Sequence, residues 1–378
     1  MIRKKSLYTN LIIIACILCN LTQIPILYDN RLLGIASTGI WIILALFMTI
    51  QEKTINLVYF VLPIFFDLYC ITFYALKSGY ISSDLFRPIN LSTFILLIGI
   101  WAGAYLDEYD LKKISGAFII SAFLVSLYLY FDVFRGVDWA GSGVYLFSAK
   151  NSAGQIFLTA VILLVLFYLK KHRVISVMIC IFFVVLIVMM KSRTTLLTMA
   201  IVLFYILLFV VEKPSYKVIG FSMILTTIIV ILTNETLYDF WINKILFNNR
   251  ETTDISGILS NRDIHYDYFK RYFGDFWLIG TGGTYLESLP LAALMSYGII
   301  GGIPVLVYSI FPLYIGLKNV RFPEFRTFCT VIISLGLMMW INGIFEEQSP
   351  FGPGVKCYFL WLVTGLLIGY KKNSGRRR

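Results

Sequence analysis

Runs of roughly 17–25 apolar residues recur from one end of the 378-residue chain to the other. A helical run of that length crosses about 30 Å of hydrocarbon. Polar residues gather between the runs, whereas a transmembrane β-barrel would show short alternating segments. The pattern therefore predicts an all-α polytopic membrane protein with about twelve spans. The predicted spans are residues 9–27, 33–50, 54–76, 90–107, 113–131, 152–169, 174–190, 194–211, 216–232, 288–317, 326–343 and 354–370.

Two of these runs need separate interpretation. The first begins around Thr9, after MIRKK, and no small-residue cleavage site follows it, so we expect a first span and not a signal peptide. The run 288–317 is too long for one upright helix, so we expect it to begin with a tilted or interfacial piece.

The basic residues between the runs predict the orientation. With the amino terminus inside, the inner segments carry 19 of the 32 Lys and Arg residues and the outer segments carry 13. The positive-inside rule then places both termini in the cytoplasm. Residues 1–378 form a single membrane domain in this interpretation, and the long loop of about 233–287, between spans nine and ten, lies outside.

Composition supports the membrane class. The chain is 59% hydrophobic and 14% charged, whereas soluble domains are about 25% charged. The net charge of +11 does not predict nucleic-acid binding, because the long outer loop holds five basic and eight acidic residues. The six cysteines lie in or beside apolar runs without metal or disulfide spacing, so we expect them to act as small core hydrophobes.

Three basic residues on the outer side stand at the expected starts of helices. Lys150 precedes Asn151 in SAKNSAG, Arg193 stands in KSRTTLL, and Arg262 stands in SNRD. A helix amino terminus is already positive, so added cations there favour a bound anion, typically phosphate. Arg also matches phosphate geometry in a bidentate way. The alternatives are snorkelling to lipid phosphates or pairing with acids such as Asp263.

The outer loop is rich in aromatic residues. Ile264, Tyr268, Phe269 and Tyr272 recur at helical spacing, which predicts a short helix from about Asn261 to near Gly274. Such a helix suits a place against the membrane or over a cavity. Its aromatic side chains suit an interfacial belt or, alternatively, stacking on sugar rings. The following WLIGTGGTY predicts a tight turn, because the glycines Gly280, Gly282 and Gly283 allow close backbone approach.

Glu287 closes this loop and is the best candidate for a general base. It follows the glycine turn and begins a helix with Ser288, and the helix amino terminus favours an ionised carboxylate. The alternative is a simple capping acid. Glu346 and Glu347 are further acids at the outer face, whereas Asp67 lies within a span, where an acid is either functional or paired with a neighbour.

Other motifs predict less. His265 lies in the loop helix, and the sequence shows no zinc, Walker or Ser-His-Asp pattern, so we expect neither a metal nor a cofactor. Gly298 and Gly302 form a GxxxG motif, which predicts close helix packing.

Taken in order, SAKNSAG, SRTTLL, SNRDIHYDYF, IGTGG and ESLPLAALMSYGIIGG resemble the O-antigen polymerase and O-antigen ligase superfamily over roughly residues 140–302. The ligase loop ends in His, then Asn, Ser or Gln, nine residues, Gly, two residues and Gly. Glu287, Ser288, Gly298 and Gly301 fit that spacing, with Glu287 in place of the catalytic His. Because polymerases vary more there, the departure favours a polymerase.

The resemblance implies a glycosyltransferase in the bacterial inner membrane with its site on the periplasmic side. Its partners would be an undecaprenyl-pyrophosphate-linked oligosaccharide, the bilayer, a chain-length regulator and a flippase. Arg193 and Arg262 would bind the pyrophosphate, with Lys150, Asn151, His265, Gly282 and Ser288 as further substrate residues. The alternatives are a ligase transferring glycan to lipid A core, a lipid-linked oligosaccharide flippase or transporter, and a purely structural assembly protein.

Overall fold

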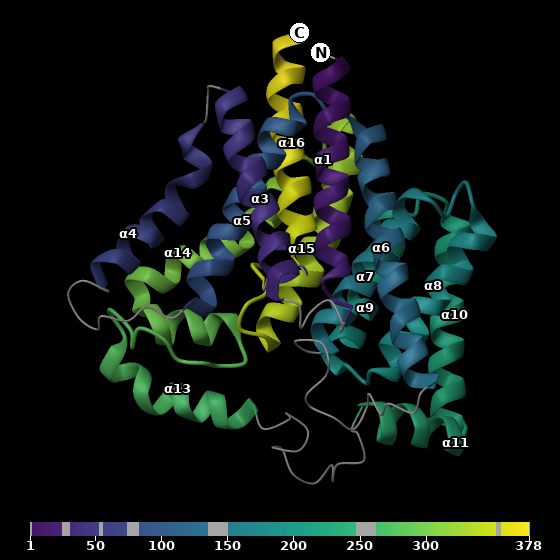
Figure 1. Cartoon of the computed structure of the whole chain (residues 1–378). Coiled ribbons are helices and arrows are strands. Elements are labelled where there is room, and N and C mark those ends of the chain that lie inside the picture. The colour runs from purple at the N-terminus through teal and green to yellow at the C-terminus, as the bar shows by residue number, and fades with distance from the viewer. Residues whose placement is uncertain are drawn as a thin grey trace.

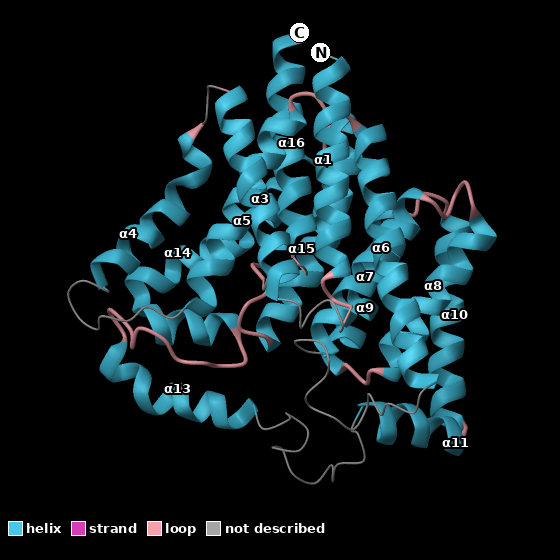
Figure 2. Cartoon of the chain, viewed as in Figure 1, coloured by secondary structure: helices cyan, strands magenta, loops and turns pink. Residues whose placement is uncertain are grey.

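The computed structural model describes residues 2–24, 31–52, 56–73, 83–134, 150–246, 262–352 and 357–377. Every regular element in these ranges is helical (Figures 1 and 2). The α-helices are α1 (Ile2–Leu21), α3 (Arg31–Gln51), α4 (Val61–Phe73), α5 (Ser83–Gly103), α6 (Glu108–Phe134), α7 (Lys150–Phe167), α8 (Arg173–Met189), α9 (Arg193–Tyr205), α10 (Pro214–Thr233), α11 (Glu235–Tyr238), α13 (Arg262–Phe276), α14 (Leu289–Asn319), α15 (Arg326–Phe345) and α16 (Tyr358–Arg377). Short 3-10 turns span Leu57–Phe60 and Pro323–Phe325, and π-helical turns span Ile206–Val210 and Asp239–Leu246.

The helices confirm the membrane class. Eight of the described helices are long and apolar enough to cross a membrane, and three shorter apolar ones are Leu57–Phe73, Ser152–Phe167 and Arg173–Met189. The chain is therefore a polytopic α-helical membrane protein. Each predicted span overlaps a helix, whereas the number of crossings and their direction stay predictions. The start of α1 and the end of α16 lie at the same end of the bundle, as an even number of crossings requires (Figure 1).

The tightest helix pair, α5 with α16, depends on glycine. A Cβ added at Gly103 would collide with the Leu366 carbonyl, and one added at Gly369 would collide with the Ile100 carbonyl. Gly365 likewise faces the α5 backbone. Small residues let transmembrane helices approach closely enough for backbone contact. Among the described helices this pair is the most extensively packed; both are labelled in Figure 1.

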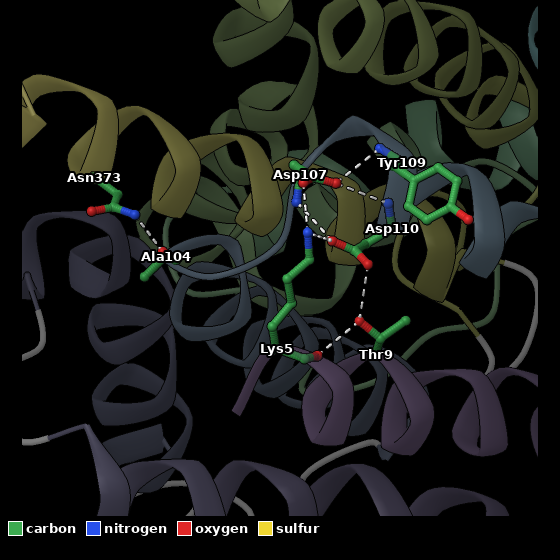
Figure 3. Close-up of polar contacts among 7 residues, drawn as sticks. All are labelled: Lys5, Thr9, Ala104, Asp107, Tyr109, Asp110 and Asn373. Atoms are coloured by element: carbon green, nitrogen blue, oxygen red, sulfur yellow. Dashed lines mark hydrogen bonds and ion pairs between the residues drawn. The ribbon is translucent and has the colours of Figure 1, made fainter. Parts of the chain in front are cut away.

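Charged residues at the terminal end of the bundle are paired between helices. Lys5 of α1 forms ion pairs with Asp107 at 2.6 Å and with Asp110 at 2.9 Å. Asp107 and Asp110 also cap the start of α6, because each carboxylate accepts a backbone N–H of this turn (Figure 3). Asp110 is buried, and Thr9 donates to it. These contacts hold α1 on α6.

Helix α14 is broken near its start. Gly298 has φ 60° and ψ −166°, a conformation that divides the helix into a short first piece and a long second piece. This break confirms that the run 288–317 does not form one straight helix. At the GxxxG motif, Gly302 lies against the backbone of Ala293 in the first piece, so the two pieces of α14 pack closely there, whereas Gly298 lies against the backbone of Leu278 and Ile279.

The described part of the outer loop contributes α11 and α13, which lie at the end of the bundle opposite the termini (Figure 1). Helix α13 continues to Phe276, two residues beyond the predicted end, because the left-handed glycine that follows it is Gly280 and not Gly274. Phe269 and Phe273 face the first piece of α14, whereas Tyr268 is exposed, so the predicted apolar stripe divides between two faces.

Candidate functional site

A segment after α13 fills the break in α14. The amides of Thr281 and Gly282 donate to the carbonyls of Met295 and Ser296 at 2.9 and 2.8 Å. In return, the amides of Ile299 and Ile300 donate to the carbonyls of Trp277 and Leu278. Broken helices within a bundle persist where the freed backbone groups find partners of this kind.

The glycine turn is therefore required by geometry, as the sequence predicted. Gly280 and Gly282 have φ values of 81° and 93°, and a Cβ at Gly280 would lie 2.5 Å from the Ser296 carbonyl. Gly282 packs on the ring of Phe73, and the Tyr69 hydroxyl donates to the Ile279 carbonyl. Helix α4 thus holds the turn on α14, and this fixes where Tyr285, Leu286 and Glu287 lie.

Arg262 and Glu287, the two predicted catalytic residues, lie against each other. Arg262 Nε is 3.2 Å from Glu287 Oε2, and the two side chains are 19% and 36% exposed. Arg262 also donates through Nη2 to the Phe345 carbonyl at 3.3 Å, and its guanidinium lies 5.6 Å from the centre of the Phe345 ring. The Nε contact is an ion pair without the alignment of a hydrogen bond. A buried N–H of the guanidinium is thus available to another acceptor.

Three carboxylates share this site. Burial raises the pKa of the Tyr285 hydroxyl, the charges of Glu287, Glu347 and Glu346 raise it further, and Arg262 lowers it. All four charged groups are therefore close enough to act on one phenol. The side chain of Glu287 pairs with Arg262, and the residue at the cap position of α14 is Ser288, which makes no side-chain capping bond.

The starts of α7 and α9, which carry Lys150 and Arg193, lie close to each other. Helices α7, α9 and α15 pack together, and Gly154 in the first turns of α7 faces Thr195 in the first turn of α9. Arg193 opens α9 as predicted and is half-buried there. Lys150 and Asn151 open α7, and their side chains lie outside the described residues. The described contacts do not place Arg193 against Arg262 or Glu287.

Gln155 is a site residue that the sequence reasoning missed. It lies on α7 one turn after Asn151, is fully buried, and donates to Glu346 Oε2 at 3.3 Å. Within the described ranges its own carbonyl Oε1 meets no hydrogen-bond donor, and the same is true of Oδ1 of the buried Asn342 on α15. The sequence signal for these residues was an amide side chain within an apolar helix. Burying an amide costs free energy unless it forms hydrogen bonds.

The remaining candidates have structural surroundings of their own. The ring of His265 on α13 lies 6.1 Å from the Tyr285 ring, so it borders the carboxylate group. Asp67 on α4 accepts a hydrogen bond from Asn90 on α5 at 2.9 Å, which is the pairing alternative for that residue. Among the described residues, no group of three His, Cys, Asp or Glu side chains is arranged to hold a metal ion.

The fold and this site define a polytopic helical membrane protein with a charged site at the end of the bundle opposite its termini. No family model matches the chain, and no curated protein matches it. The resemblance to O-antigen polymerases and ligases therefore rests on the order and spacing of the motifs alone.

Proposed function

We propose that the chain is a surface-polysaccharide polymerase that joins undecaprenyl-pyrophosphate-linked repeat units on the periplasmic face of the inner membrane. The observation that carries the proposal is the Arg262–Glu287 ion pair. It joins the residue expected to bind the leaving pyrophosphate to the residue expected to act as the base. The two candidates are 25 positions apart in the sequence and belong to one site.

The ion pair provides a way to couple donor binding to activation of the base. A pyrophosphate carries more charge than a carboxylate and accepts bidentate bonds from Arg, so it competes well for the guanidinium of Arg262. The poorly aligned contact with Glu287 is the one that it would replace. Glu287 is then released from Arg262 and can accept a hydrogen bond from the acceptor hydroxyl.

In the transfer step, Glu287 takes the proton of an acceptor sugar hydroxyl. The hydroxyl oxygen forms a bond to the anomeric carbon of the donor sugar while the bond from that carbon to the pyrophosphate oxygen breaks. The bonding pair leaves with undecaprenyl pyrophosphate, whose developing charge Arg262 stabilises. Arg193 at the amino terminus of α9 is the second cation that the resemblance assigns to the pyrophosphate.

The buried amides add a reason to expect a sugar. The carbonyls Gln155 Oε1 and Asn342 Oδ1 have no donors, and sugar hydroxyls are donors. The carboxylate of Glu346, to which Gln155 donates, accepts hydroxyl bonds in the same way. This side of the site suits the uncharged acceptor glycan, whereas the arginine side suits the anionic donor.

One observation favours a flippase as a second candidate. Discontinuous helices such as α14 form substrate sites in transporters. In this chain the backbone groups around the break are bonded to Trp277, Leu278, Thr281 and Gly282, so the break is filled by the protein's own loop. We therefore favour the transferase.

The test is deletion of the gene in its host followed by gel analysis of the surface polysaccharide. A polymerase deletion leaves single repeat units on the lipid core, and plasmid-borne wild-type protein restores the ladder. Loss of all attached glycan, with lipid-linked polymer accumulating, would identify a ligase. Lipid-linked repeat units trapped on the cytoplasmic face would identify a flippase. An unchanged ladder contradicts all three.

A further inference from the structure

Aromatic side chains line one flank of α13, beside the pair of Arg262 and Glu287. His265, Tyr268 and Tyr272 follow one another at spacings of three and four residues along this helix, so they share one flank of it. Figure 1 shows α13 lying crosswise to α1 and α16, at the end of the bundle opposite the termini. The flank therefore runs along the end face of the bundle.

The tyrosines of this flank are accessible and lie next to each other. Tyr268 and Tyr272 are 39% and 37% exposed, and their ring centres lie 4.7 Å apart at an interplanar angle of 46°. The two rings thus present neighbouring surfaces to a ligand. From His265 to Tyr272 the helix rises about 10 Å at 1.5 Å per residue, so the row is longer than one sugar ring.

The row begins at the candidate site. The ring of His265 meets the ring of Tyr285 edge-on, with the centres 6.1 Å apart and an interplanar angle of 77°. Tyr285 is 63% exposed and stands two positions before Glu287. Arg262 lies in the first turn of α13, three positions before His265. A ligand that contacts Glu287 can therefore continue over Tyr285 and His265 to the tyrosine pair.

The residues on either side of the flank indicate its surroundings. Phe269 and Phe273, on the inner side, pack against the first piece of α14 and hold the helix in place. Arg271 and Asp275, each three positions after one of the tyrosines, are exposed on the outer side. Charged side chains avoid hydrocarbon, so the flank borders water and not the bilayer core. A water-soluble ligand with apolar patches suits such a row.

Sugar rings have both of these properties. The C–H groups on one face of a sugar ring pack on the negative face of an aromatic ring, while the hydroxyls at its edge stay in water or bond to polar groups. The phenol hydroxyl of tyrosine both donates and accepts such bonds. Tyrosine also has few rotatable bonds, so it loses little conformational entropy on binding. The tyrosine pair thus suits a glycan better than a lipid chain, which has no hydroxyls to bond.

We propose that the flank of α13 formed by His265, Tyr268 and Tyr272 binds the glycan chain, with sugar rings stacked on the tyrosines while the reacting sugar lies at Arg262 and Glu287. The ligand assignment rests on the proposed function, because it takes the glycan of the transfer step as the ligand. It adds a binding surface beyond the reacting groups. This surface keeps the chain at the site between successive additions.

The test titrates full-length protein in mild detergent with the surface polysaccharide of the host, released from its lipid by mild acid, and measures the Kd by saturation-transfer NMR. The variant Tyr268→Ala/Tyr272→Ala is expected to raise the Kd roughly tenfold, because one stacked aromatic face contributes roughly threefold. Each single alanine variant then raises it roughly threefold, on the same basis. Tyr268→Phe/Tyr272→Phe keeps both rings and should bind like the wild type.

The matched control is Tyr266→Ala, which removes a tyrosine that is 43% exposed from the other flank of α13 and should leave the Kd unchanged. An unchanged Kd in the double alanine variant overturns the proposal, and so does an equal loss in the control or in the phenylalanine variant. The single alanine variants give the answer if the double variant does not fold.

Failure of the proposed function is a separate result, because binding is measured without a donor or turnover. An unchanged ladder after gene deletion overturns the proposed function. Loss of the ladder after deletion, with an unchanged Kd in the double alanine variant, overturns the binding surface alone.

Discussion

Exchanging the charges of Arg262 and Glu287 separates a catalytic pair from a structural one. The variants are Glu287→Gln, Arg262→Gln and the double variant Arg262→Glu/Glu287→Arg. The double variant keeps an ion pair between α13 and the start of α14 but reverses its direction. A pair that only holds the loop should survive this reversal, whereas a base and a phosphate clamp should not.

The magnitudes decide between the two roles. The side chains are 19% and 36% exposed, and partly exposed ion pairs contribute roughly 0.2–1 kcal/mol to stability. Losing that amount changes the folded fraction of a stable protein very little. Losing a general base lowers the rate by about 10²–10⁴-fold, and losing a charge-stabilising donor lowers it by about 10²–10³-fold. The single variants should therefore lose activity far beyond any loss of stability.

The assay expresses each variant in the deletion strain at matched membrane levels and reads the polysaccharide ladder on a gel. Purified variants are then given a lipid-linked repeat unit, and the rate of chain growth is measured. Both single variants and the double variant should fail. The control is Asp239→Asn, which breaks the ion pair of Asp239 with Lys244 at 2.9 Å elsewhere in the same loop and should leave the ladder intact. Recovery of the ladder in the double variant would refute the catalytic assignment.

Three further predictions follow from the fold. Gly298→Ala should lower the thermal unfolding temperature in detergent, because a side chain at φ 60° costs about 1–3 kcal/mol. The control Gly274→Ala has open space around the added methyl group and should not lower it. Equal unfolding temperatures for the two variants would contradict the broken helix. Gly365→Val should destabilise the bundle by about 1–3 kcal/mol through overpacking against α5, and a wild-type denaturation midpoint would contradict that contact. In an ultraviolet titration, Tyr285 should ionise above its ordinary pKa of 10.0. The neutral phenol therefore contributes to the stability of the fold below pH 10, and this contribution is lost as the pH rises through the raised pKa. Glu287→Gln should lower that pKa, and an unchanged pKa would contradict a shared site.

The sequence predicted the helices well because lipid imposes a simple rule on them. Each apolar run has to satisfy its backbone internally, so length and hydropathy nearly determine where a helix lies. The helix starts at Arg193 and Arg262 followed from polar residues beside those runs. The excess length of 288–317 also indicated that this run is not one upright helix. The position of the break at Gly298 did not follow, because it depends on which loop residues satisfy the freed backbone groups.

Contacts between distant parts of the chain were harder to predict, and the reason bears on function. Close packing of α5 with α16 comes from glycines more than 250 positions apart, which no local pattern connects. The sequence assigned Arg262 to the leaving group and Glu287 to the acceptor as independent residues, and their ion pair was not foreseen. Gln155 was passed over because an amide in an apolar helix resembles a packing residue until its partner Glu346 is known. In each case the local sequence pattern could identify a polar or small residue in an unusual place, whereas only the fold identified the partner of that residue. The coupling that we propose between donor binding and the base depends on the Arg262–Glu287 pair, and neither residue alone could have suggested it.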